Sequence, residues 1–138
     1  MNFKQEVKIV MSHFSKIKTS LKNLETLQHS LTEIGVEWFS EFTCNNILPE
    51  AKEFIKIVIP QQNSQNITFE WNGKNYELVA DLSFWQQPLS VDAFIERVTQ
   101  KYAYQTIITE AQKNGFNMIE ESKEKDGTIH LVMNRWFT

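Results

Sequence analysis

Groups that could perform catalysis are few and scattered in this sequence. The three histidines, His13, His29 and His130, fall in different segments, and no HExxH, glycine-rich phosphate loop, nucleophile elbow or EF-hand pattern accompanies them. A single histidine among apolar neighbours is usually structural, so a catalytic role for His130 is the less favoured interpretation. Glu120 and Glu121 are neighbours on an expected strand and point to opposite faces, which excludes a carboxylate pair. The sequence therefore predicts neither a catalytic centre nor a bound cofactor.

Composition indicates one soluble globular domain that needs no disulfide bond or structural metal ion. The chain has 138 residues, of which 41% are apolar and 22% charged, and this length suffices to bury a core unaided. Cys44 is the single cysteine, which excludes an internal disulfide and favours a small apolar filler. The net charge of −3 gives no general attraction to nucleic acid. Without a membrane span, signal peptide or transit peptide, the protein is expected to act where it is made.

Polar and aromatic residues between a predicted strand and a predicted helix are candidates for a binding surface. Asp81 either anchors the following turn through backbone N–H groups, which is favoured, or contacts a ligand or partner. Trp85 either fills the sheet–helix junction with its indole N–H bonded to a carbonyl, which is favoured, or is an exposed interface anchor. Gln86 and Gln87 present the same choice.

The helix expected over residues 91–114 carries two further candidates, Tyr102 and Tyr104. Its apolar stripe changes phase between them, because Val98 shares a face with Tyr102 whereas Ile108 shares the nearly opposite face with Tyr104. Either the helix bends near residues 101–104, or its second half is covered from another side, by this chain or by a partner. One of the two tyrosines is therefore a candidate for partner or ligand contact.

Capping signals define this helix and an earlier one. Ser90 can cap the later helix, and Gly115 can end it. Asn23 can cap an earlier helix whose leucines fall at helical spacing before Gly35. Strands are expected at residues 12–18, 36–39, 54–59, 67–71 and 76–82.

The Asn72-Gly73 pair predicts a β-hairpin with a two-residue type I′ turn. This turn sets Trp71 opposite Lys74, and it also pairs Phe69 with Tyr76 and Ile67 with Leu78. These residues form one mainly apolar face, and a slip of one residue would mix it with the polar face. A second hairpin is expected around Asp126-Gly127, but its register cannot be decided.

The predicted elements favour an α+β fold. We expect a two-layer sandwich in which one mainly antiparallel sheet carries two helices on one face. The element order also suggests a duplicated strand–helix–strand–strand unit, with the strand at residues 67–71 as an insertion. Residues 1–10 are interpreted as an N-terminal extension and residues 11–138 as a single α+β domain.

Three long stretches resemble one family. They are SHFSKIKT, WNGKNYELVADLSFWQQPLSVDAFIERVTQKYAY and the ending GF…DGTIHLV…RW. They resemble the hypothetical chloroplast reading frame thirty-five family of algal plastid genomes and cyanobacteria, from about Met11 to Phe137. Relatives typically begin near the position of Met11, so residues 1–10 depart from the family. The resemblance brings no catalytic or cofactor residues.

The resemblance implies a location and a range of partners. It implies a plastid protein of the chloroplast stroma, and an accessory role near a small ferredoxin or an AAA-type ATPase. The favoured hypothesis is a non-enzymatic, protein-binding accessory or assembly factor linked to photosynthetic or redox complexes.

Two alternatives stay open. One is a small-molecule-binding enzyme or sensor with a pocket near Asp81 and Trp85. The other is an RNA-binding protein, because the first 22 residues hold five lysines against one glutamate. The acidic net charge makes nucleic-acid binding the less favoured of these.

Overall fold

The computed structural model describes residues 14–42 and 55–135. In chain order the elements are β1 (Phe14–Ile17), α1 (Leu24–Glu33), β2 (Phe39–Phe42), β3 (Ile55–Ile59), β4 (Ile67–Trp71), β5 (Tyr76–Asp81), η2 (Leu82–Phe84), α2 (Val91–Lys113), β6 (Phe116–Lys123) and β7 (Ile129–Arg135). The predicted N-terminal extension, His13 and Cys44 lie outside the described residues.

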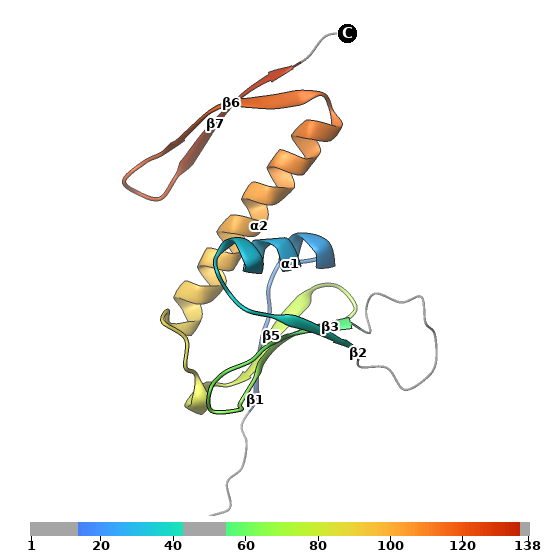
Figure 1. The fold of residues 1–138 in the computed structure, drawn as a ribbon, viewed down its shortest axis with the longest axis vertical. Helices are drawn as coiled ribbons and strands as arrows, with labels where there is room; N and C mark the ends of the chain where they lie inside the picture. Colours follow the sequence, from blue (N-terminus) through green and yellow to red (C-terminus); the bar gives the residue numbers. More distant parts are fainter. Residues whose placement is uncertain (1–13, 43–54, 136–138) are drawn as a thin grey trace, which may run out of the picture.

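Five strands form an antiparallel sheet in the order β1-β5-β4-β3-β2. β1 and β2 are the edges, and α1 connects them along the chain (Figure 1). One face of the sheet packs against both helices. The buried residues of this core are Leu21, Leu24, Leu27 and Leu31 around α1, Ile57, Ile59, Ile67, Phe69, Tyr76, Leu78 and Ala80 on the sheet, and Phe94 and Val98 on α2. The α+β class, with both helices on one face, is confirmed.

Helix α1 begins and ends as its sequence predicts. Asn23 Oδ1 accepts a hydrogen bond from the Thr26 N–H at 2.9 Å. At the other end, Gly35 has a φ of +83°, and the Val36 N–H donates to the Leu31 carbonyl at 3.0 Å. This bond closes a Schellman motif, so the chain at Val36 is still part of the helix cap. The prediction of a strand at residues 36–39 was therefore wrong by three residues at its start, since β2 begins at Phe39.

The β4–β5 hairpin has the predicted faces but a longer turn. Trp71 pairs with Tyr76, and Phe69 pairs with Leu78. The turn has four residues because Asn72 Oδ1 accepts hydrogen bonds from the backbone N–H groups of Lys74 and Asn75, at 2.8 and 2.9 Å. The predicted pairing of Trp71 with Lys74 was therefore wrong. A shift of two residues leaves each side chain on its face, which is why the apolar face was identified correctly.

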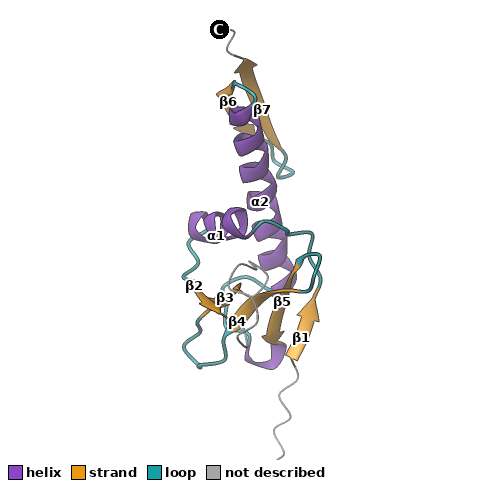
Figure 2. Cartoon of the chain, turned by 90° about the vertical axis from the view of Figure 1, so that its right-hand side faces the viewer, coloured by secondary structure: helices purple, strands orange, loops and turns teal. Residues whose placement is uncertain are grey.

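The second hairpin does not join the main sheet. β6 and β7 form a separate two-stranded sheet beside the C-terminal half of α2 (Figure 2). α2 is one helix of 23 residues that packs into the core with its first half and carries the hairpin with its second. The phase change of its apolar stripe thus accompanies a change of cover, from the core to the hairpin, although the hairpin leaves Ile107 exposed. The suggested duplication stays a prediction.

Candidate functional site

Asp81 anchors a turn. Its side chain is 6% exposed, and Oδ1 accepts a hydrogen bond from the Ser83 N–H at 3.0 Å. This bond caps the short helix η2, where the chain leaves β5. The favoured interpretation of Asp81, an anchor for nearby backbone N–H groups, describes its place in the fold.

Trp85 fills the junction between the sheet and α2. Its indole N–H donates to the Leu89 carbonyl at 2.8 Å, and its ring meets Phe94 edge to face with centroids 5.4 Å apart. Phe94 is buried in the core, so Trp85 fastens the chain entering α2 to that core. These contacts are those expected of a structural residue.

Gln86 and Gln87 are held by a residue that the sequence did not single out. Gln61 Oε1 accepts from the Gln86 backbone N–H at 2.7 Å and from Gln87 Nε2 at 3.3 Å. Gln61 Nε2 donates to the carbonyls of Phe84 and Gln65. One side chain therefore ties the loop after β3 to the turn before α2. Its position in a polar loop, residues 61–66, gave no signal of this role.

Tyr102 supports the start of α1. Its hydroxyl oxygen accepts hydrogen bonds from the backbone N–H groups of Asn23 and Lys22, at 2.9 and 3.2 Å. These donors lie at the N-terminal end of α1, where helical N–H groups lack partners within the helix. Tyr102 therefore joins α2 to α1.

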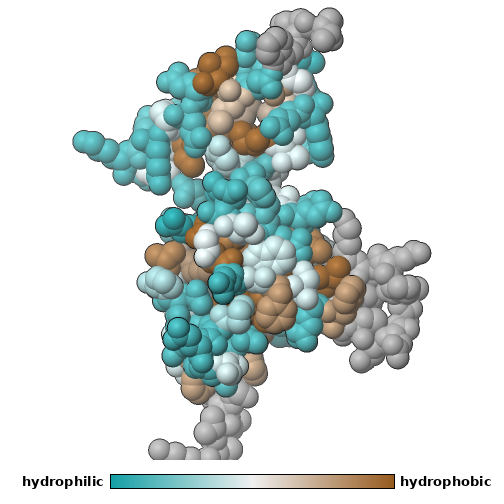
Figure 3. Space-filling model, viewed as in Figure 1, coloured by the Kyte–Doolittle hydropathy of each residue, from teal (hydrophilic) through white to brown (hydrophobic). Residues whose placement is uncertain are grey.

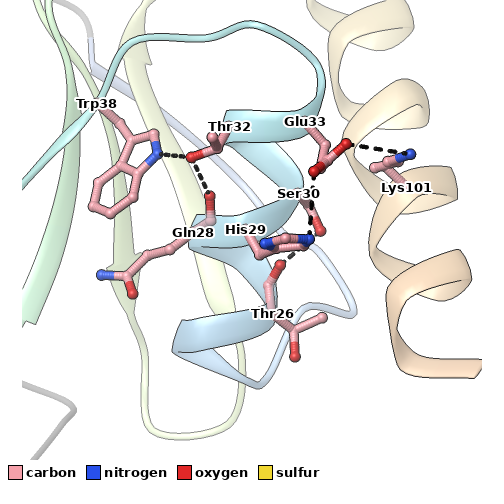
Figure 4. Close-up of polar contacts among 8 residues, drawn as sticks. All are labelled: Thr26, Gln28, His29, Ser30, Thr32, Glu33, Trp38 and Lys101. Carbon is pink, nitrogen blue, oxygen red and sulfur yellow. Dashed lines mark hydrogen bonds and ion pairs between the residues drawn. The ribbon is translucent and has the colours of Figure 1, made fainter. Parts of the chain in front are cut away.

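Tyr104 joins α2 to the hairpin. Its hydroxyl donates to Glu121 Oε2 at 3.1 Å, and Lys101 Nζ lies 4.7 Å from the centre of its ring. Lys101 Nζ also lies 4.0 Å from Glu33 Oε2, and His29 Nε2 lies 3.6 Å from Glu33 Oε1 (Figure 4). A chain of polar contacts thus runs from α1 through α2 to β6. Because the charged side chains are only partly shielded from solvent, each ion pair contributes little stability.

Removal of the Tyr104 hydroxyl should loosen the hairpin. We expect Tyr104→Phe to cost about 1 kcal/mol at neutral pH, because one hydrogen bond to a partly exposed carboxylate is lost. Amide hydrogen exchange should quicken in β6 and β7. Tyr102→Phe is the matched control, since its hydroxyl contacts the start of α1 and the hairpin amides should keep their protection. Equal exchange of the hairpin in both variants would contradict this role.

The same hydroxyl makes stability depend on pH. Burial, then the hydrogen bond to Glu121 and the negative charges of Glu121 and Glu33, raise the pKa of Tyr104 above its ordinary value of 10.0. The folded protein thus keeps this proton to higher pH than the unfolded chain. The resulting stabilisation is complete below pH 10 and is lost as the pH rises through the raised pKa. Stability should fall more steeply above pH 10 in the wild type than in Tyr104→Phe.

Two open cavities adjoin beside the first half of α2. The first, of about 440 Å³, lies between the end of α1, α2 and the hairpin. The second, of about 360 Å³, lies between the loop after α1, the end of β3 and the chain entering α2. Ile34, Leu89 and Arg97 line both cavities, and we call the combined surface the α2 groove. Gln87 and Tyr104 line it, whereas Asp81, Trp85 and Gln86 do not.

The two ends of the α2 groove differ in chemistry. The second cavity is mainly apolar, with Val36, Ile59, Pro60, Pro88, Leu89 and Phe94 in its wall. Half of the residues that line the first are charged, namely Glu33, Glu96, Arg97, Lys101, Glu121 and Lys123. Arg97 was not among the candidate residues predicted from the sequence. The signal was its spacing, because Ala93, Arg97, Gln100 and Tyr104 recur at helical intervals on one face of α2.

This arrangement can bind but shows no catalytic set. Within residues 14–42 and 55–135, no group of three or more histidine, cysteine or acidic residues could hold a metal ion. His130 Nε2 lies 3.0 Å from Glu124 Oε1 on the exposed side of the hairpin, as in a structural surface pair. No helix of the described ranges is long and apolar enough to cross a membrane.

Comparison with known proteins gives the family. The chain matches the family described as "Protein of unknown function (DUF1257)" over residues 30–132. A Guillardia theta protein named "Uncharacterized protein ycf35" is 46% identical over 129 residues, which cover 91% of this chain and 98% of the relative. A Pyropia yezoensis protein of the same name is 40% identical over 126 residues, with the same coverage of 91% and 98%. The chain belongs to this ycf35 family.

The relatives confirm the resemblance found in the sequence. A third, from Cyanophora paradoxa, is 36% identical over 126 residues. All three come from plastid-bearing organisms, and their name denotes a reading frame of plastid genomes, as expected of a plastid protein. No solved structure matched the chain significantly.

Proposed function

We propose that the protein is a non-enzymatic accessory or assembly factor of the plastid stroma that binds a protein partner linked to photosynthetic or redox complexes. The observation that carries the proposal is the exposed apolar surface at the hairpin-bearing end of the molecule. We call this part, residues 104–135, the arm. The absence of catalytic motifs from the sequence is why we propose binding rather than catalysis.

The arm exposes large apolar side chains. Ile119 is 63% exposed and Val132 is 48% exposed, and they are close together because Val132 pairs with Glu120. Ile107 on α2 is 51% exposed. Apolar side chains also show at this end of the molecule in Figure 3. Clustered apolar surface on a projecting element is typical of a protein-binding site.

The arm is also suited to binding by its construction. The hairpin lies outside the five-stranded sheet, and within the described residues β6 and β7 pair only with each other. Each therefore has one strand edge free to form main-chain hydrogen bonds with a partner. The core is built by the main sheet and the first half of α2, so the arm can engage a partner without disturbing that core.

Substitution of exposed apolar residues in the arm should weaken binding of the partner protein. We expect Ile119→Ser together with Val132→Ser to reduce recovery of specific partners from plastid extract about tenfold, because a buried apolar pair contributes over 1 kcal/mol to binding. The measurement is affinity purification of the tagged full chain with quantitative mass spectrometry. The matched control is Phe39→Ser with Leu82→Ser, which alters two exposed apolar residues outside the arm. If both double variants recover the same proteins in the same amounts, the arm is not the binding surface.

A further inference from the structure

We infer that the α2 groove binds an extended peptide segment in which one acidic residue adjoins an aliphatic residue. The inference rests on the proposed function, because it names the kind of segment that the partner protein contributes. It concerns a surface separate from the exposed apolar pair of the arm. Three observations carry it: an uncommitted arginine, an apolar cavity beside that arginine, and the charges of the remaining wall.

Arg97 is the anchor for the acidic residue. It is exposed, it lines both cavities, and it takes part in no hydrogen bond or ion pair with the described residues. The guanidinium group offers a planar fork of N–H donors that matches a carboxylate in a two-bonded geometry. The neighbouring cation, Lys101, is instead already placed between Glu33 and the Tyr104 ring. Lys123 lines only the charged cavity, so Arg97 is the cation shared by both cavities that is free to bind an anion.

The apolar cavity accepts the aliphatic residue. Arg97 lines it together with the apolar residues Leu89, Pro88, Pro60 and Ile59. Its volume of about 360 Å³ lies within the range of natural ligand sites. Because Arg97 belongs to both cavities, a carboxylate bound there places the adjoining residue at the mouth of the apolar cavity.

The shape and charges of the groove select a peptide of limited acidity. The two cavities are open clefts that share three lining residues, a form that suits an extended chain better than an enclosed small molecule. Glu96 lines the charged cavity and Glu37 lines the apolar one. These carboxylates disfavour further acidic residues beside them. The preferred segment therefore has one acidic residue at Arg97 rather than an acidic run.

A selection experiment on the full chain tests the inference. The probe is a library of random decapeptides displayed on phage, selected against the wild type and against Arg97→Gln. We expect the wild type to enrich peptides in which a single Asp or Glu adjoins Leu, Ile or Val. The selected peptides, labelled and measured by fluorescence anisotropy, should bind Arg97→Gln about tenfold more weakly, because a charge-assisted hydrogen bond is lost. Arg97→Lys should bind with intermediate affinity, since it keeps the charge but loses the fork.

Arg135→Gln is the matched control. It makes the same chemical change at an arginine that lies over the Phe116 ring, outside the groove, and should leave peptide affinity unchanged. The inference would be overturned if the wild type enriched no peptides, or peptides without an acidic residue, or polyacidic peptides regardless of their aliphatic content. It would also be overturned if Arg97→Gln bound the selected peptides as tightly as the wild type. The Ile119→Ser and Val132→Ser variant should still bind the selected peptides. If this variant loses the partner but still binds the peptides, the arm and the α2 groove are separate binding surfaces. If instead the peptides fail to bind while partner recovery still depends on the arm, the groove inference fails and the proposed function stands.

Discussion

Trp85→Ala is expected to lower the free energy of unfolding by about 3 kcal/mol, at the low end for loss of a buried tryptophan because the ring is only partly buried. The substitution removes the edge-to-face contact with Phe94 and the indole hydrogen bond to the Leu89 carbonyl. Both contacts fix the chain where it enters α2, so its first turn should fray as well. Urea denaturation at 25 °C measures the effect.

Trp85→Phe separates packing from hydrogen bonding. It keeps a ring against Phe94 but loses the N–H donor, so we expect a cost of about 1 kcal/mol from the hydrogen bond and a smaller packing loss. If Trp85 were instead an interface anchor, Trp85→Ala would leave stability nearly unchanged while abolishing partner recovery. That outcome would contradict the structural role.

Local chemistry made the helices predictable. Asn23 and Ser90 cap their helices through side-chain oxygens, and Gly35 and Gly115 adopt the positive φ that ends them. These signals depend on residues within a few positions of each other, so they can be recognised without knowledge of the fold.

For the strands, the sequence predicted which side chains share a face of the sheet, but not which residues pair. In the β4–β5 hairpin the faces were right, but the side chain of Asn72 lengthened the turn and shifted the partners by two. In the β6–β7 hairpin a bulge at Ile119, between Met118 and Glu120, reverses the alternation within β6. Phe116 and Met118 therefore share a face with Glu121 and not with Glu120. Because the bulge changes the alternation within the strand, no assumed turn length could separate apolar from polar side chains along this hairpin.

The groove could not be predicted because it is formed by elements distant in the chain. Ile34, Leu89 and Arg97 meet only after α1 and α2 pack on the same face of the sheet. The phase change in α2 left open whether the helix bends near residues 101–104 or its second half is covered from another side, by this chain or by a partner. Trp85 was selected as an aromatic residue at the sheet–helix junction, and Tyr102 because the apolar stripe changes phase beside it. In the structure Trp85 packs on Phe94, and Tyr102 accepts hydrogen bonds from the start of α1.

Gln61→Ala should produce the second large effect, a loss of about 2 kcal/mol in the free energy of unfolding. The side chain accepts from Gln86 and Gln87 and donates to the carbonyls of Phe84 and Gln65. A net hydrogen bond contributes about 1 kcal/mol, and partial exposure allows water to replace some of the four. The neighbouring Gln62 is exposed and makes no hydrogen bond among the described residues, so Gln62→Ala is a control expected to change stability by less than about 0.5 kcal/mol.

Hydrogen exchange should localise the effect of Gln61→Ala. The Gln86 amide donates directly to Gln61 Oε1 at 2.7 Å, so it should lose protection in Gln61→Ala and keep it in Gln62→Ala. Gln61→Glu should fall between them, because a carboxylate still accepts from Gln86 but can no longer donate to the Phe84 carbonyl. The wall of the apolar cavity includes Gln87, so loosening this contact should also weaken peptide binding in the α2 groove. Equal stability of the two alanine variants would show that the loop after β3 does not hold the entry to α2.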